Sequence, residues 1–187
     1  MDTMDIQTYG KRAREFGKAM KWIDSSISLV ACGLADSCEW NAEAMKSLCG
    51  LVDYVSAHHY SVGWGPFERD NYLQNLYVPE YMKNMTEMVK ASIIVGTNNN
   101  ECEVKVAWDE WNLFGWQVDG VDDDRSYTLQ NALITGLVLN FFIKNCETVG
   151  MANYSTFVNI NGALGVKPDG IVCRPQFHVF DMIGNNT

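Results

Sequence analysis

The sequence has no excess of positive charge. It carries 14 Lys and Arg against 23 Asp and Glu, which gives a formal net charge of −9. Nucleic acids and anionic membranes both bind through basic patches, so we expect neither as a partner. The sequence also lacks a long apolar run: NALITGLVLNFFIKN, residues 131–145, falls short of the roughly 20 residues that span a bilayer. The opening residues are polar and charged, unlike a secretory signal, and we therefore expect a cytoplasmic protein.

Metal- and phosphate-binding motifs are missing as well. The six cysteines form no C-x-x-C pair, which argues against a zinc ribbon or a thioredoxin-type site. Several lie in apolar segments, so we expect reduced thiols that are buried as small hydrophobic groups. No glycine-rich loop follows an expected strand, so nothing supports a nucleotide site. His58 and His59 are adjacent and would point to opposite faces of a strand. We expect no metal and no cofactor.

The sequence does contain a regular alternation of helical and extended patterns. Hydrophobic residues make up 47% of the chain, which is enough for the core of one domain over residues 1–187. Tyr9, Ala13 and Phe16 recur at steps of three and four, which predicts a helix that Thr8 could cap. The expected helices cover residues 8–24, 39–50, 78–96, 126–146 and 175–184, and the expected strands cover 26–33, 51–60, 101–110 and 148–154. Strands that alternate with helices predict an α/β fold with a parallel sheet.

Four parallel strands leave two architectures open. One is a complete open α/β domain. The other is part of a (β/α)8 barrel, which needs eight strands and about 250 residues. Polar side chains after the expected strands suit a barrel, because barrel enzymes place their active sites at the carboxyl ends of strands, but the pattern alone leaves the two architectures equally open.

Adjacent carboxylates, Asp109 and Glu110, end one expected strand among aromatic residues, and Tyr60 ends another. A carboxylate in such a pocket can act as a nucleophile or as an acid or base. Asp109 and Glu110 cannot be a catalytic pair, because neighbours on a strand point to opposite faces. The plainer interpretation is that one forms a structural ion pair and the other is solvated.

Several separate motifs carry a resemblance to a known family. VKVAWDEWNLF, YTLQNALITGLVLNFFIKNCETVGMANYSTFVNINGAL and DGIVCRPQFHVF occur in order, preceded by KRAREFGKAMKWIDSSISLVACG and VDYVSAHHY. Together they resemble the α-L-arabinofuranosidases of glycoside hydrolase family 51. The resemblance implies a (β/α)8 barrel, hydrolysis with retention, an arabinofuranosyl-containing oligo- or polysaccharide as substrate, and a homo-oligomeric parent. It identifies Glu110 as the nucleophile. It also implies substrate-binding roles for Tyr60, His58, Trp111, Phe114 and Arg174. Gln176 is the alternative to Arg174 for the same sugar-contacting position of the family.

One departure from the family pattern is large. The family's acid/base is the Glu of a Gly-Asn-Glu motif after strand 4, and this sequence has no such motif. The four strands would then be strands 5 to 8, the C-terminal half of the barrel, with most of the family's β-sandwich absent. We expect the isolated chain to be inactive. The alternatives are a related retaining barrel glycosidase of other sugar specificity and a non-catalytic half-barrel.

Overall fold

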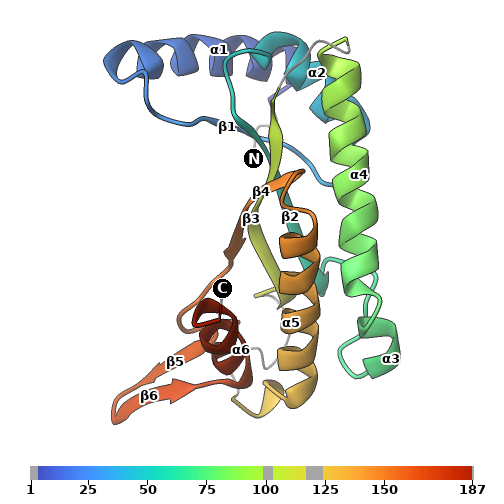
Figure 1. Ribbon diagram of the computed structural model, residues 1–187, viewed down its shortest axis with the longest axis vertical. Coiled ribbons are helices and arrows are strands. Elements are labelled where there is room, and N and C mark those ends of the chain that lie inside the picture. The colour runs from blue at the N-terminus through green and yellow to red at the C-terminus, as the bar shows by residue number, and fades with distance from the viewer. Residues whose placement is uncertain (1–3, 99–102, 117–123, 187) are drawn as a thin grey trace. The chain divides into compact units, whose positions relative to one another are not determined.

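The computed structural model describes residues 4–98, 103–116 and 124–186. The five predicted helices and four predicted strands appear in the predicted order, with a short helix added before the third predicted helix and two strands added before the last (Figure 1). The helices are α1 (Ile6–Ile23), α2 (Cys38–Leu48), α3 (Tyr72–Asn75), α4 (Val78–Gly96), α5 (Leu129–Lys144) and α6 (Pro175–Gly184), with a 3-10 turn at Asp124–Ser126. The strands are β1 (Val30–Ala31), β2 (Tyr54–Val62), β3 (Lys105–Phe114), β4 (Val149–Tyr154), β5 (Leu164–Lys167) and β6 (Gly170–Cys173).

Four of the strands form one sheet in the order β1-β2-β3-β4. β1 pairs with β2 in parallel. Between β2 and β3, Lys105 N–H donates to the Asp53 carbonyl and Gly115 N–H donates to the Val62 carbonyl. The partners ascend together along both strands, so this pair is also parallel. The predicted α/β fold with a parallel sheet is confirmed.

The contacts within the chain divide it into two compact units. The first comprises Met1–His58, Asn84–Trp108 and Glu147–Met151, and the second comprises His59–Lys83, Asp109–Cys146 and Ala152–Thr187. β2, β3 and β4 each contribute residues to both units.

In the first unit α1 packs beside α2 (Figure 1). Ala31, Ala44 and Leu48 form a buried cluster there, and the Tyr9 ring stacks on Trp40 with centroids 5.5 Å apart. The predicted cap of α1 is wrong: Asp5 is the N-cap, and its Oδ1 accepts a hydrogen bond of 2.8 Å from Thr8 N–H. The Thr8 N–H lies in the first turn of α1 and has no carbonyl partner within the helix, so it bonds to the side chain of the aspartate three residues upstream.

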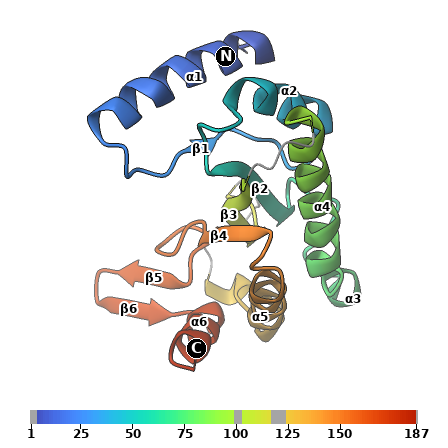
Figure 2. The same cartoon turned by 45° about the horizontal axis from the view of Figure 1, so that its top comes forward.

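In the second unit α5 packs beside α6, and the β5–β6 hairpin lies next to α6 (Figure 2). This antiparallel hairpin was not predicted from the sequence. Its signal is Pro168-Asp169-Gly170 between two short apolar runs, which is typical turn chemistry.

Three further expectations need correction. β1 has two residues rather than the eight of 26–33. β3 continues to Phe114, so Asp109 and Glu110 lie within the strand rather than at its end; residues 101 and 102 of the predicted strand fall outside the described residues. Cys32, in the apolar segment LVACG, is exposed rather than buried, and Cys49, in SLCGLV, is only half-buried. Apolar neighbours in sequence therefore do not report burial at these positions.

Candidate active site

Glu110 and Tyr60 meet in the second unit, on the neighbouring strands β3 and β2. The Tyr60 Oη lies 3.0 Å from Glu110 Oε2 and 2.7 Å from Ser155 Oγ, just after β4. Tyr60 is buried and Glu110 is half-buried. Three consecutive strands of the sheet therefore bring one carboxylate, one phenol and one hydroxyl together.

The hydrogen bonds at Tyr60 have a defined direction when Glu110 is ionised. A carboxylate can only accept, so the single Tyr60 hydroxyl hydrogen goes to Glu110. Ser155 must then donate its own hydroxyl hydrogen to the Tyr60 oxygen. The result is a chain of donors from Ser155 through Tyr60 to the carboxylate, and hydrogen bonds to an ionised acceptor are the strong ones.

The environment of Tyr60 keeps its phenol protonated. Burial raises the pKa of Tyr60 to about 12, the hydrogen bond from Ser155 opposes this rise, and the hydrogen bond and negative charge of Glu110 add to it. Tyr60 is therefore a hydrogen-bond donor to Glu110 throughout the neutral pH range.

Two buried asparagines hold this arrangement in place, and the sequence analysis missed both. The Asn112 amide donates to the Ser155 carbonyl at 2.9 Å and to the Asn161 carbonyl at 2.7 Å. The Asn161 amide donates to the Phe114 carbonyl at 2.7 Å. Asn112 shares a strand face with Glu110, two residues away, and an asparagine in such an apolar strand was the available signal.

Trp111 takes a position away from the carboxylate. It is 2% exposed and packs against Phe142 and Tyr154, with ring centroids 5.2 and 5.0 Å away. Trp111 and Glu110 are neighbours on β3 and so face opposite sides of the sheet.

Arg174 and Phe114 are also enclosed by protein. Arg174 is 3% exposed; its Nε donates to Asp124 Oδ1 at 3.0 Å, and its guanidinium carbon lies 3.9 Å from the Tyr127 ring centroid. Phe114 is 2% exposed beneath the Arg69 guanidinium, 5.3 Å from the ring centroid.

The remaining candidates are His58 and Gln176. His58 is exposed in the first unit, where its Nε2 lies 3.2 Å from Ser56 Oγ. Gln176 is 1% exposed, and its Oε1 has no hydrogen-bond partner among the described residues. The second unit brings Tyr60 into hydrogen-bond contact with Glu110. The substrate-binding roles of the others stay predictions.

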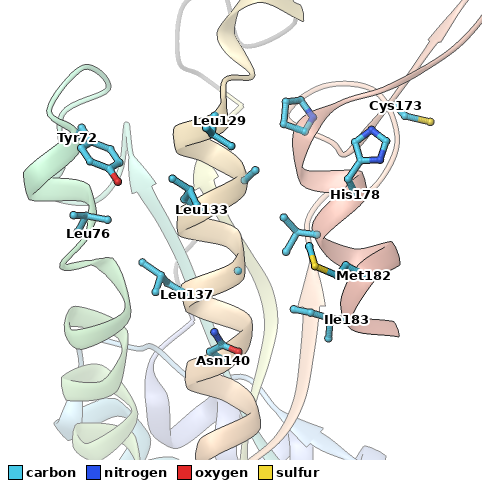
Figure 3. A pocket seen from close by; sticks show the side chains of 14 residues that line it. Tyr72, Leu76, Leu129, Leu133, Leu137, Asn140, Cys173, His178, Met182 and Ile183 are labelled. Atoms are coloured by element: carbon cyan, nitrogen blue, oxygen red, sulfur yellow. The ribbon is translucent and has the colours of Figure 1, made fainter. Parts of the chain in front are cut away.

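An apolar groove of about 760 Å³ also lies in the second unit, between α5 and α6. Leu129, Leu133 and Leu137 project into it from successive turns of α5, and Met182 and Ile183 face them from α6 (Figure 3). Neither Glu110 nor Tyr60 lines this groove. Among the described residues, no group of three His, Cys, Asp or Glu side chains could hold a metal, and none of the described helices combines the length and apolarity that crossing a bilayer requires.

A half-buried carboxylate held against a tyrosine hydroxyl on an α/β sheet could act chemically as a nucleophile or as an acid or base. Comparisons with known proteins show what the chain is similar to. The Alpha-L-arabinofuranosidase C-terminal domain family matches residues 109–187. The intracellular exo-α-(1→5)-L-arabinofuranosidase of Halalkalibacterium halodurans is 29% identical over an alignment that covers 88% of this chain and 36% of the relative.

Solved structures agree. The Thermotoga petrophila family-51 α-L-arabinofuranosidase is 26% identical with a TM-score of 0.86, over 98% of this chain and 37% of that one. The Thermotoga maritima α-L-arabinofuranosidase, solved as an arabinose complex, is 26% identical with a TM-score of 0.84, over 98% of this chain and 36% of that one. The chain is thus similar in sequence and fold to α-L-arabinofuranosidases of glycoside hydrolase family 51, and it spans about a third of the length of the proteins it matches.

Proposed function

We propose that this chain supplies the nucleophile, Glu110, of a retaining α-L-arabinofuranosidase. The observation that carries the proposal is the hydrogen bond of 3.0 Å between Tyr60 Oη and Glu110 Oε2 on adjacent strands. It fixes a carboxylate at a defined position and orients it, and a covalent mechanism needs both.

In the proposed reaction the Glu110 carboxylate attacks the anomeric carbon of a terminal arabinofuranosyl group. The bond from that carbon to the leaving oxygen breaks, and the leaving oxygen takes a proton from a general acid. Water then hydrolyses the glycosyl ester and restores the carboxylate. Tyr60 stabilises the ionised form of Glu110 before attack and again after hydrolysis.

The general acid is not part of the motif that contains Glu110. Retaining glycosidases separate their two carboxyl groups by about 5–5.5 Å, and Asp109 sits on the opposite strand face from Glu110. We propose that the four strands correspond to strands 5 to 8 of an eight-stranded barrel and that another polypeptide segment provides the acid. The share of about 36% that the chain covers of its relatives supports this.

The names of the relatives support a proposal for the substrate and location of the parent protein. Three of them are named intracellular exo-α-(1→5)-L-arabinofuranosidases. We propose an arabinofuranosyl-containing oligo- or polysaccharide as substrate, an intracellular location and a homo-oligomeric parent.

Leaving-group chemistry provides the test. A dinitrophenyl arabinofuranoside needs no proton on its leaving oxygen, whereas an alkyl arabinofuranoside does. General acid assistance is worth on the order of 10²–10⁴-fold. The 187-residue chain, expected to be inactive on glycosides that need this proton, should therefore leave the alkyl glycoside intact. With the dinitrophenyl glycoside it should release dinitrophenol slowly and carry a pentosyl group on the peptide that contains Glu110, detected by mass spectrometry.

Two variants control this experiment. Glu110→Gln should abolish both the release and the pentosyl adduct, whereas the matched change Asp109→Asn next to it should leave both in place. Equal release by wild type and Glu110→Gln would refute the assignment and favour a non-catalytic half-barrel. Faster Glu110-dependent release from a dinitrophenyl xyloside would instead indicate a related glycosidase of other sugar specificity.

A further inference from the structure

Two tryptophans in the second unit form an exposed aromatic pair. Trp64 follows β2 and Trp116 follows β3. Their ring centroids lie 4.5 Å apart with an interplanar angle of 67°, yet Trp64 remains 59% exposed and Trp116 50% exposed. Large aromatic side chains gain most from burial, so an exposed pair in contact usually marks a binding surface.

The backbone fixes both tryptophans to β2. Gly65, next to Trp64, donates its N–H to the Tyr60 carbonyl at 2.9 Å, and Gly115, next to Trp116, donates to the Val62 carbonyl at 3.0 Å. A Cβ on Gly65 would lie 2.5 Å from the Ser61 carbonyl oxygen, so the chain can approach β2 this closely only with glycine there. The pair therefore belongs to the sheet rather than to a loose loop.

The tryptophan pair adjoins the candidate site through Tyr60. The Tyr60 ring centroid lies 5.6 Å from Trp64 and 5.7 Å from Trp116, in edge contacts. The tryptophans meet Tyr60 at its ring, whereas Glu110 meets it at its hydroxyl. A sugar whose anomeric carbon faces Glu110 and a sugar on the tryptophan pair would therefore occupy two different positions.

We propose that Trp64 and Trp116 form a binding platform for a second sugar ring, the one on the leaving-group side of the scissile bond. Indole faces pack against the apolar C–H surfaces of sugar rings, and ligand sites are lined mostly by such aromatic surfaces. This inference rests on the proposed function: if the group at Glu110 is a terminal arabinofuranosyl unit, its neighbouring ring is the one that departs. The platform would thus select oligosaccharides over single arabinose units.

The competing explanation is that the tryptophans only shield the Tyr60 ring from water. In that case their loss would alter the surroundings of Tyr60 but not the affinity for sugar. A comparison of arabinose with an α-1,5-linked arabinotriose separates the two explanations, because only the trisaccharide can reach both positions.

The experiment is a titration of the full chain, followed by NMR of the indole N–H groups. Arabinotriose should shift the resonances of Trp64 and Trp116 and leave that of Trp22, an 89% exposed tryptophan on α1, unchanged. Trp64→Ala and Trp116→Ala should each weaken arabinotriose binding about 3- to 10-fold without affecting arabinose binding. Trp22→Ala is the matched control and should bind as wild type.

Three results would overturn the platform: no shift of either indole, equal affinity for arabinose and arabinotriose, or wild-type binding by both alanine variants. The dinitrophenyl arabinofuranoside assay is run on the same wild-type protein. Arabinotriose binding at Trp64 and Trp116 by a wild-type chain that shows no Glu110-dependent dinitrophenol release would refute the proposed nucleophile and leave the platform standing, so the two failures are distinguishable.

Discussion

Replacement of Arg174 by methionine separates a structural role from a substrate-binding one. The buried guanidinium donates to Asp124 and stacks on Tyr127, and its Nη1 also donates to backbone carbonyls within residues 159–162. The carbonyl oxygens that accept from this Nη1, at 2.9, 3.2 and 2.8 Å, are those of Asn159, Ile160 and Gly162. Methionine keeps much of the volume and removes every donor.

The expected cost is large for one side chain. Each lost hydrogen bond is worth about 1 kcal/mol net, and the acceptors left behind add a desolvation cost. Asp124 keeps its ion pair with Lys167 at 3.0 Å, and its side chain is 34% exposed, so the carboxylate adds little. We expect Arg174→Met to lower the free energy of unfolding by about 3 kcal/mol, a large share of the 5–15 kcal/mol that is typical of a domain.

Urea unfolding measures this cost directly. A loss of about 3 kcal/mol should lower the urea midpoint by roughly 1–2 M. The matched control is Arg14→Met, which removes an exposed arginine with one hydrogen bond, to the Ser47 carbonyl, and should change stability by less than about 1 kcal/mol. If Arg174→Met kept wild-type stability but lost arabinotriose binding, the structural reasoning would be wrong and the substrate-binding prediction would stand.

Three other changes test separate parts of the molecule. Ser155→Ala removes the donor to Tyr60 and should slow Glu110-dependent dinitrophenol release about 5-fold, whereas Ser155→Thr keeps a hydroxyl and should restore it; equal rates for both variants would contradict the donor chain. Burial lowers the pKa of His59 from 6.5 to about 4 in the folded state. As pH falls below about 6.5, His59 therefore binds a proton in the unfolded state before it does so in the folded state, and this favours unfolding. This contribution to the free energy of unfolding is complete above about pH 6.5 and is lost toward about pH 4. Between about pH 7.5 and 4.5, the free energy of unfolding measured in urea should therefore fall about 2 kcal/mol less in His59→Phe than in wild type. An equal fall in both proteins would exclude His59 as the source. Gly33→Ala places a Cβ against the Ser56 carbonyl oxygen and should cost at least about 2 kcal/mol in thermal unfolding, whereas Gly136→Ala within α5 meets only ordinary contact and should not destabilise; similar melting temperatures for the two would refute the clash.

Local patterns in the sequence were sufficient for the order of the elements and for several of their bounds. The predicted helices at 78–96 and 175–184 coincide with α4 and α6, because hydrophobic periodicity and Pro and Gly signals act over a few residues. The motif around Glu110 likewise made this carboxylate the candidate nucleophile, since the motif is contiguous in the chain.

Contacts between distant residues could only come from the tertiary structure. Tyr60 reaches Ser155 across 95 positions, and Arg174 reaches Asp124 across 50. Nothing local to Arg174 tells whether a charged side chain will meet substrate or be buried among carbonyls, because burial depends on segments that arrive from elsewhere in the chain. The same holds for Trp111 and Trp116, both near Glu110 in the same motif: strand direction and packing bury one and leave the other half exposed.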